Sequence, residues 1–146
     1  MKQVINKILC PYDGTVSSER TFKNILNLAK QYEATILILT CIKDKATFGF
    51  FKLKSDKKTI KMQKERALKK IENLKNRAQE KGVSIKARVI KCDVISKEII
   101  DYARKEDADL IAMSKAKRGT MAEKMYNEST VEKVFREAPC TFMHIK

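Results

Sequence analysis

Histidine, proline and glycine are scarce in this 146-residue chain, which has one, two and four of them and no tryptophan. Its four cysteines lie far apart and form no CxxC pair. Zinc sites are usually built from closely spaced cysteines and histidines, so the sequence argues against a metal site of this kind. In a reducing compartment such cysteines are ordinarily free thiols.

Long hydrophobic runs are also absent. The longest, residues 34–42, contains two threonines and falls far short of the roughly 20 apolar residues that cross a bilayer. Lys2 and Gln3 follow Met1, and no apolar segment of signal-peptide length comes after them. We therefore expect an unprocessed, cytoplasmic protein without a membrane partner.

The overall composition is typical of a globular domain. Hydrophobic residues make up 43% of the chain and charged residues 34%, a balance that favours a buried core over disorder. A chain of this length usually forms one domain, and no repeat, linker or low-complexity tail divides it. We expect a single domain over residues 1–146.

Positive charge dominates, with a formal net charge of +14. Residues 43–81 alone hold 14 basic and 5 acidic side chains. Such a field favours anionic ligands, nucleic acid or acidic partners, without implying sequence-specific recognition. A solvated, lysine-rich helix face accounts for the same pattern, so both interpretations stay open.

Apolar segments of strand length alternate with segments of helical periodicity. The expected strands are 7–11, 35–42, 85–91, 110–113 and 141–145. One expected helix begins at Ser17, and three others span 59–81, 95–106 and 129–137. Strict alternation indicates parallel strands with right-handed crossovers. The fold class is therefore α/β, an open five-stranded parallel sheet with helices on both faces.

Residues 43–58 break this alternation, because their phenylalanines and lysines follow neither period. We expect this segment to be irregular. The long helix after it should be capped at its C-terminus by Gly82. Its expected apolar face consists of Ile60, Leu68, Ile71, Leu74 and Ala78.

Asp13 follows the first expected strand, in the sequence Pro11-Tyr12-Asp13-Gly14. In open α/β sheets, ligands bind beyond the carboxyl ends of the strands. A carboxylate there can accept hydrogen bonds from a ribose diol. An aspartate before glycine also commonly bonds its own turn backbone, and the sequence favours neither role.

Ser129-Thr130-Val131-Glu132 has the pattern of a capping box at the start of the last helix. The serine hydroxyl and the glutamate would then satisfy the free amides of the first turn. The same amides and hydroxyls are suited to binding phosphate, because the helix N-terminus carries partial positive charge.

Cys10, Cys41 and Cys92 each fall near the end of an expected strand. If those strands are parallel neighbours, the three thiols share one edge of the sheet. They are then either free thiols or a redox or metal group.

No catalytic set is evident. The single histidine, His144, lies on the expected terminal strand without a nucleophile near it in sequence, and a structural or interface role suits it better than general-base catalysis. Gly119 stands alone, without the glycine-rich loop and lysine of a Walker motif. The sequence does not indicate an enzyme.

Taken in order, four segments resemble the universal stress protein family. They are the strand ending in P-x-D-G with its helix and second strand (8–42), CDVISKEIIDYARKEDADLI (92–111), DADLIAMS (107–114) and STVEKVFREAPCTFMHI (129–145). The resemblance covers nearly the whole chain. It implies a Rossmann-like, adenine nucleotide alpha hydrolase-like fold and a regulatory role in the stress response.

The resemblance also implies a homodimer joined through the last strand. The corresponding residues are Thr141, Phe142, Met143, His144 and Ile145. Pairing there would cover an exposed strand edge.

Many family members bind ATP, with Mg as its companion, and the first aspartate holds the ribose. The positions implied here are Pro11, Asp13, Cys41, Ile42, Met113, Ser114, Lys117, Ser129 and Thr130. Asp13 would hold the ribose, and adenine would lie near Cys41, Ile42 and Met113.

The phosphate loop departs from the family pattern. Ser114 and Lys117 stand where G-x-x-G is expected, and Glu128 replaces the glycine before Ser129. Side chains there hinder close approach of the backbone to phosphate, and Glu128 repels it. Lys115, Lys117 and Arg118 could supply charge-assisted hydrogen bonds instead. Three functions remain open: a nucleotide-binding regulator, a dimeric interaction module without nucleotide, and an electrostatic binder of nucleic acid or acidic partners through 43–81.

Overall fold

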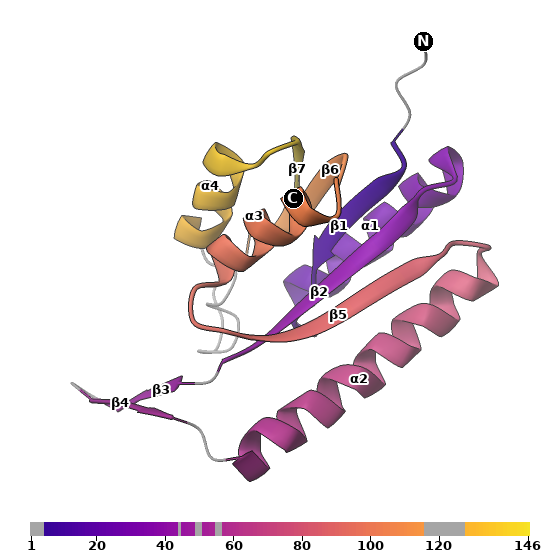
Figure 1. Ribbon diagram of the computed structural model, residues 1–146. Helices are drawn as coiled ribbons and strands as arrows, with labels where there is room; N and C mark the ends of the chain where they lie inside the picture. Colours follow the sequence, from indigo (N-terminus) through magenta and orange to yellow (C-terminus); the bar gives the residue numbers. More distant parts are fainter. Residues whose placement is uncertain (1–4, 44, 49–50, 55–56, 116–127) are drawn as a thin grey trace.

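The computed structural model describes residues 5–43, 45–48, 51–54, 57–115 and 128–146, and its centre is a five-stranded parallel sheet (Figure 1). The strand order is β5-β2-β1-β6-β7. The strands are β1 (Lys7–Pro11), β2 (Thr35–Lys43), β5 (Ile85–Cys92), β6 (Leu110–Ser114) and β7 (Thr141–Ile145). The open parallel sheet predicted from the alternation is confirmed, with strand boundaries within one residue of those expected.

Buried aliphatic side chains on both faces explain why β1 and β2 occupy the interior of the sheet. Ile8 and Ile36 pair in register, as do Leu9 and Leu37, and all four are essentially inaccessible to solvent. A strand that is apolar on both faces is stable only where helices cover both sides. Since β1 pairs with β2 on one side and β6 on the other, the connections diverge at β1.

Two helices cover each face of the sheet. The helices α1 (Val16–Tyr32) and α2 (Lys57–Glu80) pack on the side of Ile8 and Ile36. The helices α3 (Ile95–Lys105) and α4 (Glu128–Glu137) pack on the side of Leu9 and Leu37. Helices on both faces are therefore confirmed.

The first helix begins slightly before the expected Ser17. Its N-cap is Thr15, whose hydroxyl accepts a hydrogen bond from the Ser18 amide. Ser17 lies inside the first turn and is buried, where its hydroxyl donates to the Lys115 carbonyl at 3.4 Å. The polar residues of this segment thus serve the turn between β1 and α1.

The apolar face of α2 differs from the prediction at one position. Ile71, Leu74 and Ala78 are buried as expected, but Leu68 is 51% exposed and Ala67 is buried in its place. Gly82 has φ +71° and follows the helix end, and the Val83 amide donates to the Ala78 carbonyl at 2.8 Å. The predicted glycine cap is confirmed.

Residues 43–58 contain regular structure, contrary to the expected irregular segment. Strands β3 (Lys45–Phe48) and β4 (Phe51–Lys54) pair antiparallel, with Lys45 opposite Lys54, and form a separate two-stranded sheet (Figure 1). Alternating hydrophobicity is too weak over four residues to predict such short strands. Within the described ranges, no helix has both the length and the apolar content needed to cross a membrane.

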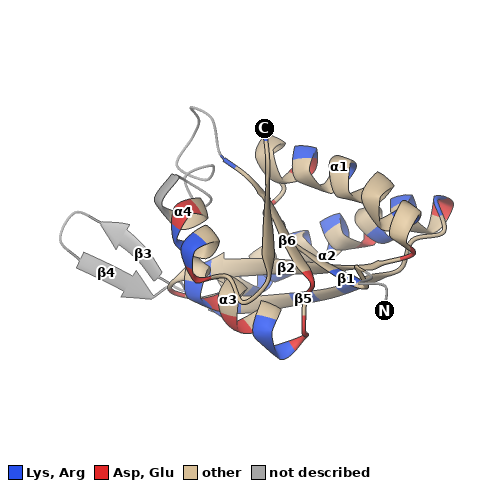
Figure 2. Cartoon of the chain, turned by 90° about the horizontal axis from the view of Figure 1, so that it is seen from above, with Lys and Arg blue, Asp and Glu red and all other residues tan. Residues whose placement is uncertain are grey.

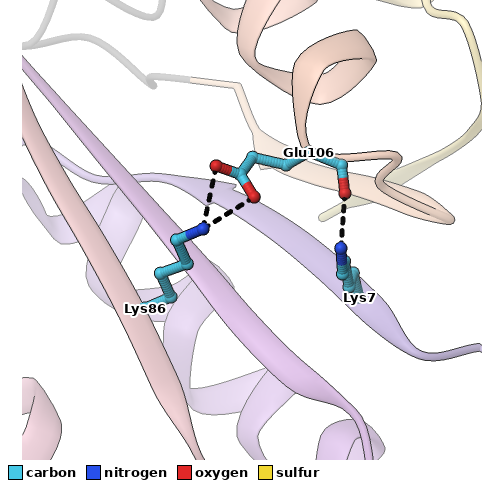
Figure 3. Close-up of polar contacts among 3 residues, drawn as sticks. All are labelled: Lys7, Lys86 and Glu106. Atoms are coloured by element: carbon cyan, nitrogen blue, oxygen red, sulfur yellow. Dashed lines mark hydrogen bonds and ion pairs between the residues drawn. The ribbon is translucent and has the colours of Figure 1, made fainter.

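Lys7, Lys86 and Glu106 connect three elements near the start of the strands (Figure 3). The Lys86 ammonium on β5 contacts both carboxylate oxygens of Glu106, at 2.9 and 3.0 Å. The Lys7 ammonium on β1 donates to the Glu106 backbone carbonyl at 2.8 Å. Lys86 lowers the pKa of Glu106, mainly through this hydrogen bond, and Glu106 raises the pKa of Lys86.

This pair predicts a defined pH dependence. Because its pKa is lowered by folding, Glu106 stabilises the native state above the pKa of an unfolded glutamate, about 4.3, and loses that effect as the pH falls through the native pKa. We expect Glu106→Gln to lower the free energy of unfolding in urea by a constant amount between about pH 5 and 9, and by much less near pH 3. Glu72→Gln on the exposed side of α2 is the charge-matched control. A loss of unfolding free energy that is as large near pH 3 as it is between about pH 5 and 9 would contradict the interaction.

Candidate functional site

A pocket of about 300 Å³ opens at the carboxyl ends of β1 and β2. Its base is the Tyr12–Asp13 segment and the last residues of β2, and one wall is α2. The lining residues are Tyr12, Asp13, Thr15, Thr40, Cys41, Ile42, Lys43, Gln63, Arg66, Ala67 and Lys70. The carboxyl edge of a parallel sheet is where the architecture is expected to place a ligand.

The two carboxylate oxygens of Asp13 have different environments. Oδ1 accepts hydrogen bonds from the Thr15 amide at 3.0 Å, the Thr15 hydroxyl at 2.6 Å and the Ser18 hydroxyl at 2.9 Å. Oδ2 is enclosed and has no hydrogen-bond partner among the described residues. The turn role is thus carried by one oxygen, which leaves the other as a free acceptor on a pocket-lining residue.

The base of the pocket is held to the neighbouring strand by backbone and side-chain hydrogen bonds. The Tyr12 amide donates to the Leu39 carbonyl at 2.9 Å, and the Thr40 hydroxyl donates to the Tyr12 carbonyl at 2.8 Å. The Tyr12 hydroxyl donates to Glu19 at 2.7 Å. Burial and this carboxylate raise the pKa of Tyr12, so the phenol stays protonated and keeps its donor role.

Helix α2 supplies a wall that the sequence did not predict. Gln63, Arg66, Ala67 and Lys70 line the pocket, and their spacing of three and four residues places them on one side of the helix. They continue the buried face of Ala67, Ile71 and Leu74. This helical spacing was the available signal, but it becomes informative only once α2 is known to lie beside β2.

Gly14 allows α2 to approach the turn after Asp13. Its φ is +83°, a left-handed conformation that favours glycine. A Cβ at this position would collide with the end of the Lys70 side chain and lie 3.0 Å from its Cδ and Cε atoms. The Lys70 ammonium therefore lies directly against the turn that carries Asp13.

The implied pocket residues are only partly brought together. Asp13, Cys41 and Ile42 line the pocket. Pro11 is the last residue of β1, where it is buried and is not among the residues that line the pocket. Met113 belongs to the apolar core on the α3 and α4 side, and Ser114 accepts a hydrogen bond from Arg20 at 3.3 Å.

The remaining implied residues lie in or after the β6–α4 connection. Lys117 is outside the described residues, and the side chain of Ser129 is not described either. Helix α4 begins at Glu128, so Ser129 is a first-turn residue rather than the expected N-cap, and Thr130 is half-buried. The phosphate-binding role of this segment stays a prediction.

Cys41 and Cys92 meet, whereas Cys10 does not join them. Cys41 on β2 and Cys92 on β5 belong to the core on the α3 and α4 side, and Cys10 lies in the core on the opposite face. The three strands are parallel neighbours and all three thiols are free, as one of the two interpretations predicted, but they form no common group because Cys10 faces the opposite side of the sheet. No cluster of three metal-ligating side chains occurs in the part of the chain that the structure describes.

The environments of these thiols shift their pKa values in different directions. The hydrogen bond between the two thiols lowers the pKa of Cys92. The same hydrogen bond raises the pKa of Cys41, and burial raises the pKa of Cys41 further. Burial also strongly raises the pKa of Cys10. Cys92 is thus the member of the pair that ionises first.

Alkylation should reveal this hydrogen bond. We expect the pH midpoint for iodoacetamide labelling of Cys92, followed by peptide mass spectrometry, to lie below that of an ordinary thiol, about 8.5. Cys41→Ala removes the donor and should raise the midpoint, whereas Cys41→Ser retains a hydroxyl donor and should raise it less. Identical midpoints in the wild type and Cys41→Ala would exclude the interaction.

Comparisons with known proteins agree with this architecture. The model of the Universal stress protein family (Usp) matches residues 5–146. A universal stress protein of Methanocaldococcus jannaschii is 29% identical over 151 residues, which cover 99% of this chain and 84% of that protein.

Two solved structures share the fold over nearly their full length. Universal stress protein UspA from Lactobacillus plantarum has a TM-score of 0.79 and 19% identity, covering 99% of this chain and 100% of that one. A universal stress protein from Archaeoglobus fulgidus in complex with dAMP has a TM-score of 0.68 and 14% identity, covering 99% and 100%. At these identities the likeness concerns the fold alone.

Proposed function

Because the chain belongs to the universal stress protein family, we propose that it is a non-enzymatic regulatory protein that binds an adenine nucleotide beside Asp13. The observation that carries the proposal is the enclosed Oδ2 of Asp13, a pocket-lining residue, which has no hydrogen-bond partner among the described residues. An enclosed acceptor without a donor costs about 1–3 kcal/mol. A ribose hydroxyl is a donor of suitable size and chemistry to remove that cost.

The chemistry around Asp13 supports a nucleoside rather than a smaller polar ligand. Ile42 and Ala67 give the pocket apolar surface suited to a base, and Thr15 and Thr40 add hydroxyl groups. The structural relative from Archaeoglobus fulgidus holds dAMP. These features favour an adenine nucleotide, and the charged residues of the pocket favour a phosphorylated one.

A regulatory role accords with the placement of the single histidine. His144 is exposed on β7 and is not among the residues that line the pocket. The pocket residues include no pairing of a nucleophile with a histidine base. Occupancy of the pocket, rather than turnover, is therefore the signal that we assign to the protein. The four free cysteines suit the reducing cytoplasm.

Asp13→Asn tests the nucleotide site while preserving the turn. The asparagine Oδ1 can still accept from Thr15 and Ser18, but its amide nitrogen replaces the free acceptor with a donor. We expect AMP at 100 times its dissociation constant to stabilise the wild type by about 2.7 kcal/mol in thermal unfolding, and the Asp13→Asn change to weaken binding by about tenfold or more. The unliganded variant should melt near the wild-type temperature.

Asp13→Ala separates the two roles of the carboxylate. It removes the acceptor for Thr15 and Ser18 as well, so the unliganded protein itself should be destabilised. An AMP-dependent shift that is the same size in the wild type and in Asp13→Asn would show that Asp13 does not hold the ribose.

We also propose a homodimer through β7. This edge strand pairs with β6 on one side, and Phe142, Met143 and Ile145 remain only half-buried. Phe135 is 60% exposed and stacks edge-on against Phe142, with ring centroids 5.6 Å apart. An apolar strand edge of this kind is stabilised by pairing with another strand.

The dimer predicts sensitivity to charge on the edge strand. Thr141 and His144 are both exposed, so the double variant Thr141→Lys, His144→Lys should fold while placing like charges across the interface. Light scattering should give a dimer mass for the wild type and a monomer mass for this variant at low micromolar concentration. The control variant Gln31→Lys, Gln79→Lys adds the same charge at two exposed positions outside β7, and it should remain dimeric. A wild-type monomer, or an unaffected double variant, would contradict the interface.

A further inference from the structure

Helix α2 carries a charge pattern that the ribose contact does not explain. Its sequence contains nine Lys or Arg residues and three Glu, and basic residues recur along the helix (Figure 2). Most point to solvent, but Arg66 and Lys70 line the pocket. These two are one helical turn apart and flank the buried Ala67.

We propose that Arg66 and Lys70 form an anion-binding wall that contacts the phosphate of the bound nucleotide. The inference rests on the proposed function, and it assigns to α2 a role expected of the β6–α4 connection. The pocket then selects phosphorylated nucleosides over neutral nucleosides. Asp13 contributes equally to both ligands, because both contain the ribose.

The position of α2 is fixed from its C-terminal half. The Arg77 guanidinium contacts the Glu19 carboxylate at 2.6 Å and lies over the Phe22 ring, 4.9 Å from its centroid. Glu19 also accepts the hydrogen bond from Tyr12, a residue of the pocket base. In the same half of the helix, the side chains of Ile71, Leu74 and Ala78 are buried in the core. This contact holds the segment with Arg66 and Lys70 beside the pocket.

The absence of Cβ at Gly14 brings the Lys70 charge close to Asp13. The Lys70 ammonium lies against Gly14, one residue from the carboxylate that we assign to the ribose. In a nucleoside monophosphate the phosphate is attached to that ribose. A cation beside the ribose contact is therefore within reach of the phosphate.

Charge balance in the pocket also favours an anion. Lys43, Arg66 and Lys70 line it together with one carboxylate, Asp13. Among the ion pairs of the described chain, none joins Arg66 or Lys70 to a carboxylate. Both side chains are exposed, so water screens their charge and a moderate gain in affinity is expected. A guanidinium and an ammonium together suit a dianionic phosphate.

The test compares AMP with adenosine by calorimetry. In the wild type we expect AMP to bind more tightly, with a preference that falls as potassium chloride is raised. The double variant Arg66→Gln, Lys70→Gln keeps side-chain length and removes both charges. It should weaken AMP binding by about tenfold and leave adenosine binding unchanged. Lys69→Gln, which alters an exposed neighbour outside the pocket lining, should leave both affinities unchanged.

Each alternative result has a distinct meaning. Equal losses for AMP and adenosine would assign Arg66 and Lys70 a structural role and overturn the inference. A loss of AMP binding in Lys69→Gln as large as in the double variant would show that the overall positive charge of α2 attracts the anion, without a specific contact. Unchanged AMP binding in the double variant would place the phosphate elsewhere. In these three cases the nucleotide site itself stands. Failure of the wild type to bind either ligand would overturn the proposed function together with this inference.

Discussion

The contact of Glu19 with Tyr12 and Arg77 is the interaction on which the pocket depends. One carboxylate joins the base of the site to the helix that forms its wall, with distances of 2.7 and 2.6 Å. Phe22 packs beneath it, edge-on to Tyr12 with ring centroids 6.4 Å apart and under the Arg77 guanidinium. This cluster fixes α2 against α1, so the face of α2 nearer its start lies beside the ends of β1 and β2.

The sheet could be predicted because its signal is local and strong. Continuous aliphatic runs such as residues 35–42 are compatible with a strand covered on both faces, and their alternation with helices leaves parallel pairing as the consistent solution. The errors occur where the signal is weak or depends on tertiary packing. Four-residue strands in 43–58 carry little periodicity, and the exchange of Leu68 for Ala67 on α2 reflects which residue fits closely against the sheet.

The candidate site could be predicted only for residues whose place in the fold follows from the element beside them in the sequence. Asp13 comes soon after β1, so its place at the carboxyl edge follows from the strand. Its predicted turn role is confirmed through Oδ1, and Oδ2 has no partner among the described residues, which is compatible with the ribose role that we propose. Arg66 and Lys70 could not be assigned in this way. They lie more than 50 residues from Asp13, and their contribution depends on the Arg77 contact and on Gly14, which only the three-dimensional arrangement connects.

A crystal structure of the protein with AMP tests the central claim most directly, because it locates ribose and phosphate relative to named side chains. The account predicts a ribose hydroxyl within hydrogen-bond distance of Asp13 Oδ2, about 2.6–3.0 Å. It also predicts the phosphate against Lys70 and Arg66. AMP bound with its ribose away from Asp13, or with Oδ2 still lacking a donor, would contradict it.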